Sequence, residues 1–258
     1  MPVMSEFQEE RDSIKQRPFK DRLSYFWDYY KWYVIGGVLA VIFTVSLIRT
    51  IFFSKDTALY IAWINFSDFA AEDTDVYQPL LDYLAEQGLD TDHYDIVMDS
   101  TLRLSNTEMT EEAVIGSQKI GAYIAAKELD GIVAGRDMFL TQAYQDLLLP
   151  LSDYMSEDEI ASLEEQGLLF YIDYKLVEEI TSTESMIFDE AFLSTLPDPT
   201  DPDSMEEPVA VGVRVDGSSV IGNSYYLLDD DDSAYAGAIL NSTRTGNVDT
   251  FIQWLLEQ

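Results

Sequence analysis

The stretch Trp32–Phe53 reads WYVIGGVLAVIFTVSLIRTIFF and divides the chain into two unequal parts. No charged residue interrupts it between Trp32 and Ile48. At ~1.5 Å rise per helical residue, roughly 20 residues cross the ~30 Å hydrocarbon core of a bilayer, and Arg49 can extend toward the head groups. A buried core helix would normally carry a polar face, which this stretch lacks. We therefore expect a transmembrane helix over residues 32–53.

A cleaved signal peptide is the main alternative to an uncleaved anchor. The charged leader, residues 1–31, is longer than that of an ordinary secretory signal. The segment that follows, Arg49–Ser54, contains no small-x-small cleavage pattern. These two features favour an anchor that stays attached to the chain.

Charge is distributed unevenly about this stretch. The chain has 15 Lys and Arg against 48 Asp and Glu, a formal net charge of −33. Six of the 15 basic residues precede the stretch, whereas beyond residue 56 only seven basic residues accompany 41 acidic ones. Because basic flanks favour the cytoplasmic side, we expect a single-pass cell-membrane protein with a cytoplasmic N-terminus and an extracytoplasmic acidic domain. Such a surface repels nucleic acid, so no nucleic-acid partner is expected.

Residues 57–258 have the composition of a folded domain. The chain is 47% hydrophobic and contains no cysteine, which suits an exported bacterial domain without disulfides. Short apolar strand patterns at 59–64, 94–98 and 130–135 alternate with helix patterns, and this rhythm predicts an α/β fold with parallel strands and helices on both faces. Further on, residues 209–215 alternate as a strand, and Asp216-Gly217 predicts a hairpin turn into 218–221.

The leader, residues 1–31, is expected to be cytoplasmic. It contains an apolar stripe at spacings of three and four, typical of an amphipathic helix in the membrane interface: Phe19, Leu23, Phe26, Trp27 and Tyr30. The segment FKDRLSYFWDYYKWY, followed directly by the apolar stretch, resembles the leader of uncharacterised single-span membrane proteins of Gram-positive bacteria. This resemblance implies an architecture and not an activity.

A second resemblance lies in the acidic domain. The segment DGIVAGRDMFLTQAYQDLLLPLSDYMSEDE, residues 130–159, is similar to bacterial extracytoplasmic solute-binding proteins of the type 2 periplasmic-binding fold, and so are 236–242 and 245–256. It implies a three-layer α/β domain resembling part of that fold. The chain departs from the family in lacking a lipobox cysteine, and its short middle, 156–208, leaves little room for a second lobe. Because such receptors hold their ligand between two lobes, the departure puts ligand capture in doubt.

If a ligand is bound as in that family, loops at the carboxyl ends of the strands would contact it. The candidate residues are Asn65, Ser67, Ser100, Thr101, Arg136 and Asp137. Arg136 could meet an anionic group through its guanidinium. Neutralisation of surrounding carboxylates is the simpler interpretation of that arginine.

Catalytic motifs are scarce. The single histidine, His93, lies in an acidic turn, and the count of His and Cys excludes a zinc site built on several of them. No G-x-S-x-G, Walker or G-x-G-x-x-G pattern occurs. An EF-hand-like register from Asp229 fails, because Ala234 and Leu240 stand where glycine and glutamate are required. We expect no cofactor and no metal; a weak ion at Asp198, Asp201 and Asp203 is an alternative to a solvated loop.

Together these features predict a membrane-anchored, non-enzymatic solute-binding-like or interaction module. Its expected partners are the bilayer, through Trp32–Phe53, and a membrane permease or another surface protein. Two alternatives stay open. One is an authentic substrate receptor for an ABC importer. The other is a carboxylate-dependent surface hydrolase, whose two carboxylates cannot be selected from 41 candidates.

Overall fold

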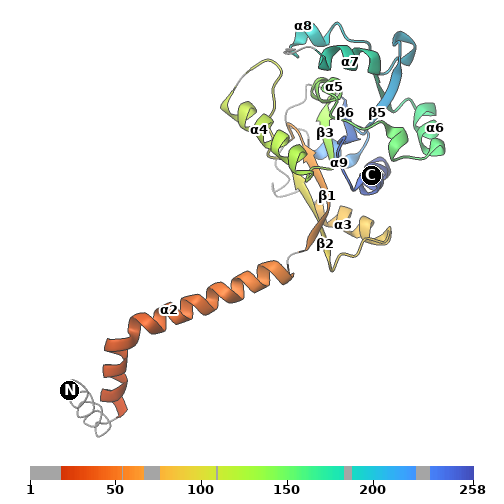
Figure 1. Ribbon diagram of the computed structural model, residues 1–258. Helices are drawn as coiled ribbons and strands as arrows, with labels where there is room; N and C mark the ends of the chain where they lie inside the picture. The colour runs from red at the N-terminus through yellow and green to blue at the C-terminus, as the bar shows by residue number, and fades with distance from the viewer. Residues whose placement is uncertain (1–18, 54, 67–75, 109, 183–187, 225–232) are drawn as a thin grey trace. The chain divides into compact units, whose positions relative to one another are not determined.

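The computed structural model of the chain describes residues 19–53, 55–66, 76–108, 110–182, 188–224 and 233–258 (Figure 1). The chain divides into two compact units, Met1–Ser54 and Lys55–Gln258. We describe each unit by itself.

The described residues of the first unit form one continuous helix, α2 (Phe19–Phe53). Its segment Tyr30–Arg49 has a mean hydropathy of 1.9, and none of it is buried. Large apolar side chains such as Trp32, Val41 and Phe43 are mostly exposed, unlike those of a core helix. The helix is therefore long and apolar enough to cross a membrane. The amphipathic segment and the apolar stretch expected from the sequence are parts of this single helix.

The second unit is built on one six-stranded mixed sheet with the strand order β2-β1-β3-β6-β5-β4. Strands β1, β2 and β3 run parallel, as their strand–helix rhythm predicted, whereas β6, β5 and β4 pair antiparallel. The strands are β1 (Asp56–Trp63), β2 (Tyr94–Asp99), β3 (Gly131–Gly135), β4 (Leu169–Asp173), β5 (Pro208–Arg214) and β6 (Ala234–Ala238).

Helices cover both faces of this sheet (Figure 1). Alternation along β1 shows why both faces are apolar: Leu59, Ile61 and Trp63 enter one core, and the intervening residues enter the other. The first core is covered by α3 (Tyr77–Glu86), α6 (Glu157–Glu165), α9 (Ser219–Ser224) and α10 (Thr245–Glu257). The second is covered by α4 (Glu111–Ala126), α5 (Arg136–Tyr144), α7 (Tyr174–Thr181) and α8 (Glu190–Leu193). The domain is thus a three-layer α/β structure.

The hairpin expected at Asp216-Gly217 is wrong. After β5 the chain enters α9 instead of a returning strand, and β5 pairs with β4 and β6. The middle segment, 156–208, contributes α6 and β4, and β4 joins the same sheet through β5. The segment therefore extends the one sheet that the described residues form.

Two glycines set how closely the elements on the second face approach one another. The ring of Phe139, on α5, packs over Gly212 of β5, where an added Cβ would lie 2.5 Å from it. Gly116, on α4, packs against the loop that follows β2, and a side chain there would collide with the carbonyl oxygen of Arg103. These two contacts fix the position of α5 on the sheet and of the loop after β2 on α4.

Candidate functional site

The candidate residues that the structure describes lie at the edge of the sheet where the three parallel strands end, but they do not form one site. Asn65, after β1, adopts a left-handed conformation with φ 64°. Its side-chain amide donates to the carbonyl oxygen of Leu104 at 3.0 Å and accepts from the Leu104 N–H at 2.9 Å. Asn65 therefore fastens the loop after β2 to the end of β1. Ser67 lies outside the described residues.

Arg136 and Asp137 begin α5 and form an ion pair with each other, with 3.3 Å between Nη1 and Oδ1. Both side chains are well exposed. The arginine also contributes to holding the pKa of Asp198 below its usual value, after the hydrogen bonds that Asp198 accepts from Thr200. These contacts fit a cation that offsets neighbouring carboxylates.

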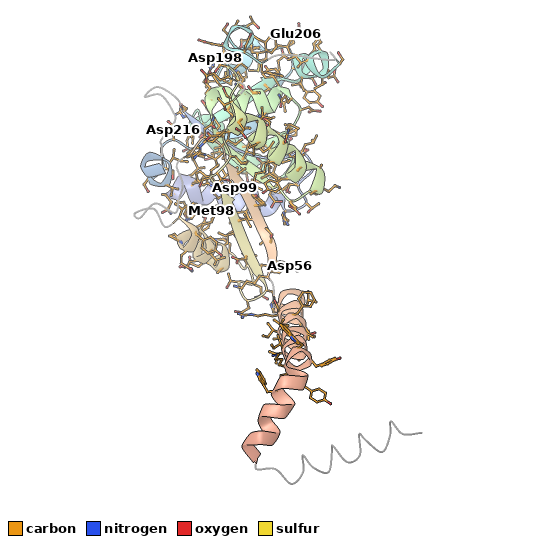
Figure 2. All side chains as sticks on the ribbon, turned by 90° about the vertical axis from the view of Figure 1, so that its left-hand side faces the viewer. Asp56, Met98, Asp99, Asp198, Glu206 and Asp216 are labelled. Atoms are coloured by element: carbon orange, nitrogen blue, oxygen red, sulfur yellow. The ribbon has the colours of Figure 1, made fainter. Side chains whose placement is uncertain are left out.

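Ser100 and Thr101 line a hollow of about 500 Å³ at the end of β2. Asp99, at the opposite end of the β1–β2 pair from Asp56 (Figure 2), accepts hydrogen bonds from the Thr101 N–H at 2.9 Å and the Thr101 hydroxyl at 2.5 Å. The ammonium of Lys119, from α4, lies 2.9 Å from Asp99 Oδ2. Thr101 thus belongs to a network centred on the Asp99 carboxylate, and the backbone carbonyl oxygen of Ser100 accepts from Arg103 Nη1 at 2.6 Å.

Electrostatics keep this network charged. Burial raises the pKa of Asp99, but the hydrogen bonds from Lys119 and Thr101 together outweigh burial, so the net pKa lies below its ordinary value. The hydrogen bond to Asp99 raises the pKa of Lys119. Burial raises the pKa of the Tyr60 hydroxyl, which donates to Asp99 as a neutral group at 3.2 Å.

The lowered pKa of Asp99 predicts a pH-dependent contribution to stability. A carboxyl group whose folded pKa is depressed stabilises the fold above its unfolded pKa of ~3.9 and loses that contribution as the pH falls through the folded value. We expect Asp99→Asn to lower the free energy of unfolding by about 1–3 kcal/mol at pH 7. The difference from wild type should shrink steadily below pH ~4 in urea unfolding. A constant difference down to pH ~2 would contradict this assignment; the exposed Asp82→Asn is the matched control.

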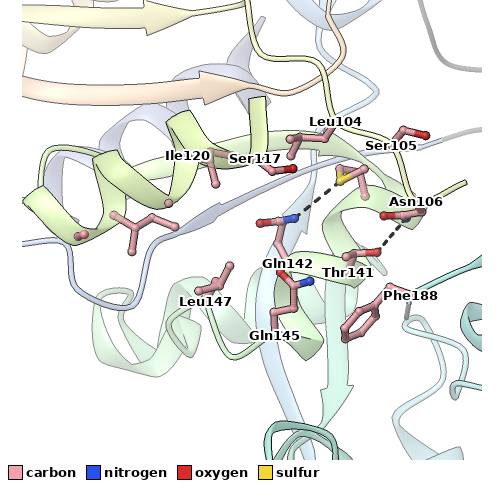
Figure 3. Close-up of a pocket in the computed structure, with 14 residues that line it drawn as sticks. Leu104, Ser105, Asn106, Ser117, Ile120, Thr141, Gln142, Gln145, Leu147 and Phe188 are labelled. Atoms are coloured by element: carbon pink, nitrogen blue, oxygen red, sulfur yellow. Dashed lines mark hydrogen bonds between the residues drawn. The ribbon is translucent and has the colours of Figure 1, made fainter. Parts of the chain in front are cut away.

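A second pocket, which the sequence did not predict, lies between α4, α5 and the loop after β2 (Figure 3). Its volume is about 510 Å³. Helix α4 lines the pocket with residues between Ser117 and Ala125, and α5 contributes Met138, Thr141 and Gln142. The ring of Phe188 lies at one side of the pocket. The lining residues are Leu104, Ser105, Asn106, Ser117, Ile120, Gly121, Ile124, Ala125, Met138, Thr141, Gln142, Gln145, Leu147 and Phe188. We call this cavity the α4–α5 pocket.

The polar lining of the α4–α5 pocket consists of amides and hydroxyls. Asn106 donates through Nδ2 to the Thr141 hydroxyl at 2.9 Å, and that hydroxyl donates to the Asp137 carbonyl oxygen at 2.9 Å. Gln142 is 6% exposed. Its Nε2 lies 3.7 Å from Met138 Sδ, and sulfur is a weak acceptor. The pocket therefore presents a buried amide whose hydrogen-bonding capacity is largely unused.

One feature of the sequence could have indicated this pocket. Thr141, Gln142 and Gln145 lie at helical spacing in a segment that is otherwise apolar, and α5 is buried from Met138 through Tyr144. Polar residues on a fully buried helix point to an internal polar site. The packing partner, α4, could not be inferred from that spacing.

The structure shows the surroundings of the single histidine and of those potential metal ligands that it describes. No group of three or more His, Asp or Glu side chains among the described residues could hold a metal ion. His93 is exposed, and its Nδ1 lies 2.8 Å from Asp90 Oδ2, a partner that the sequence did not reveal. The hydrogen bond from His93 holds the pKa of Asp90 below its usual value. Asp198 accepts from the Thr200 N–H and hydroxyl, the pattern of a local turn.

Comparisons of the chain with protein-family models, with curated proteins and with solved structures found no match.

Proposed function

We propose that the protein is a membrane-tethered, non-enzymatic binding module whose acidic α/β domain lies outside the cytoplasm. The apolar helix α2 supplies the tether, and the six Lys and Arg gathered in the 31 residues before Trp32, against seven in the whole domain beyond residue 56, favour a cytoplasmic N-terminus. In this topology the domain reaches its ligand or partner at the cell surface.

The observation that carries the binding role is the α4–α5 pocket. Its volume of about 510 Å³ falls within the ~300–1,000 Å³ of pockets that hold small molecules. Apolar walls and a few convergent polar groups are the usual composition of such sites.

The same lining supports a role in binding more than one in catalysis. General acid–base chemistry requires a side chain that exchanges protons near the working pH. The residues that line the α4–α5 pocket carry amides, hydroxyls, a thioether and hydrocarbon groups, none of which titrates in that range. Among the described lining residues, a ligand held there would meet no proton donor or acceptor of that kind.

We propose further that the fold derives from extracytoplasmic solute-binding proteins, which parts of the sequence resemble. Three parallel strands joined through helices, in a sheet covered on both faces, are compatible with one lobe of such a receptor. The middle segment adds to that sheet, so we place the ligand in the α4–α5 pocket and not between lobes. A permease or another surface protein is the partner that this origin suggests.

Ligand-observed NMR with the full-length chain in lipid nanodiscs tests the binding role. A fragment library containing neutral, anionic and cationic members should give hits whose signals disappear in Gly121→Leu. An added Cβ at Gly121 meets no atom within 4 Å, so the larger side chain enters the open pocket. Ala122→Leu, next in the same helix but outside the pocket lining, is the matched control and should keep the hits. A library without a single hit sensitive to Gly121→Leu would contradict the proposed function.

A further inference from the structure

The chemistry of the α4–α5 pocket selects among ligands by charge. Beyond residue 56, 41 Asp and Glu accompany seven Lys and Arg, yet among the residues that the structure describes no charged side chain lines this pocket. An ionised group is costly to bury unless an opposite charge pairs with it. A carboxylate, a phosphate or an ammonium would find no such partner among the lining residues.

The polar groups of the pocket are suited to a neutral amide. Asn106, Gln142 and Gln145 each carry a carbonyl acceptor beside an N–H₂ donor. Such a group can accept from the N–H of a peptide bond and donate to its carbonyl oxygen. Gln142 is best placed, because its side chain is buried and its one hydrogen bond among the described residues is the weak contact to Met138 (Figure 3).

Apart from the hydroxyls of Ser105, Ser117 and Thr141, the remaining lining is hydrocarbon and thioether. Seven apolar side chains surround the amides: Leu104, Ile120, Ile124, Ala125, Met138, Leu147 and Phe188. Branched aliphatic walls complement an aliphatic group of similar shape and offer no partner to the many hydroxyls of a sugar. The pocket thus combines one peptide-like polar face with an apolar cavity.

We propose that the α4–α5 pocket binds an uncharged, peptide-like ligand in which a secondary amide adjoins a branched apolar group, with Gln142 as the residue that recognises the amide. This proposal rests on the proposed function and adds the class of ligand.

Three probes with the same body and different charge test the class. They are N-acetyl-leucine methylamide, which is neutral, N-acetyl-leucine, which is anionic, and leucine methylamide, which is cationic. We expect the full-length chain in nanodiscs, at 0.15 M salt to screen the acidic surface, to bind the neutral probe with a dissociation constant of about 1 mM or tighter. The two charged probes should bind at least tenfold more weakly, and empty nanodiscs serve as the blank.

Substitutions at Gln142 test the assigned residue. Gln142→Leu removes the donor and the acceptor at similar volume and should weaken binding of the neutral probe at least tenfold. Gln142→Glu keeps the shape, adds a negative charge and should shift the preference toward leucine methylamide. The control is Gln166→Leu, a surface glutamine on the far side of the sheet, which should leave binding unchanged. Thermal melting of each variant establishes that it is folded.

Equal or tighter binding of either charged probe, or of N-acetylglucosamine, would overturn the ligand class. Unchanged affinity in a folded Gln142→Leu variant would overturn the role of Gln142. If fragments of another chemical class bind and Gly121→Leu abolishes their binding, the proposed binding role of the pocket is retained and the proposed ligand class is wrong.

Discussion

Asp130→Ala is expected to lower the free energy of unfolding by about 3–5 kcal/mol, because it leaves a partly buried guanidinium without its counter-charge. Asp130 is fully buried just before β3. Its carboxylate accepts from the Tyr60 N–H at 2.8 Å, the Ser242 hydroxyl at 2.7 Å and Arg244 Nε at 2.9 Å. The same arginine donates to the carbonyl oxygens of Thr57 and Glu128, so it joins β1, β3 and the start of α10.

A double-mutant cycle in urea separates this pair from a general loss of packing. The double variant Asp130→Leu with Arg244→Met should be more stable than Asp130→Leu alone, because it removes the uncompensated charge. The exposed pair Lys175 and Glu206 supplies the control, and Lys175→Ala should leave the free energy of unfolding nearly unchanged. A loss under ~1 kcal/mol for Asp130→Ala would show that the pair does not hold these elements together.

Phe139→Ala is expected to cost about 3–5 kcal/mol as well, here through a cavity. The ring is fully buried on the second face of the sheet. Its centroid lies 5.0 Å from that of Phe170 and 5.8 Å from that of Tyr235. Because the ring seats α5 on the sheet, its loss should also weaken ligand binding in the α4–α5 pocket.

Gly212 provides a specific test of this packing. In wild type, Gly212→Ala places a methyl group against the Phe139 ring and should cost about 1–3 kcal/mol. In the Phe139→Ala background the same methyl enters the cavity and should be neutral or stabilising, as measured by urea unfolding. Additive losses from the two substitutions would contradict the packing. Phe192→Ala, at a partly buried ring elsewhere, should give a smaller loss than Phe139→Ala.

Sequence patterns predicted the elements that depend on local spacing. The strands at β1, β2 and β3 are short apolar runs joined through helices, and that rhythm leaves parallel pairing as the ordinary outcome. Such local patterns could not predict which strands pair when they are far apart in the sequence. Asp216-Gly217 has the composition of a hairpin turn, but β5 pairs with β4, which precedes it, and with β6, which begins 20 residues after the end of β5.

The candidate site likewise combines residues that local patterns predicted with contacts that they could not predict. Reasoning from strand ends selected Ser100 and Thr101, which line a hollow, but it also selected Asn65, which fastens a loop. The α4–α5 pocket arises where two helices meet on one face of the sheet, and no local pattern specifies that contact. Likewise, Asp130 and Arg244 are 114 residues apart, so their pairing appears only in three dimensions.

Impermeant maleimide labelling of intact cells that express the chain tests the tethered topology most directly. The chain contains no cysteine, so single substitutions report one position each. Ser194→Cys places a thiol at an exposed site of the acidic domain, and Ser13→Cys places one before α2. We predict that position 194 is labelled in intact cells and that position 13 is labelled only after lysis. Labelling of position 194 only after lysis, or recovery of the full-length chain in the soluble fraction without detergent, would contradict the account.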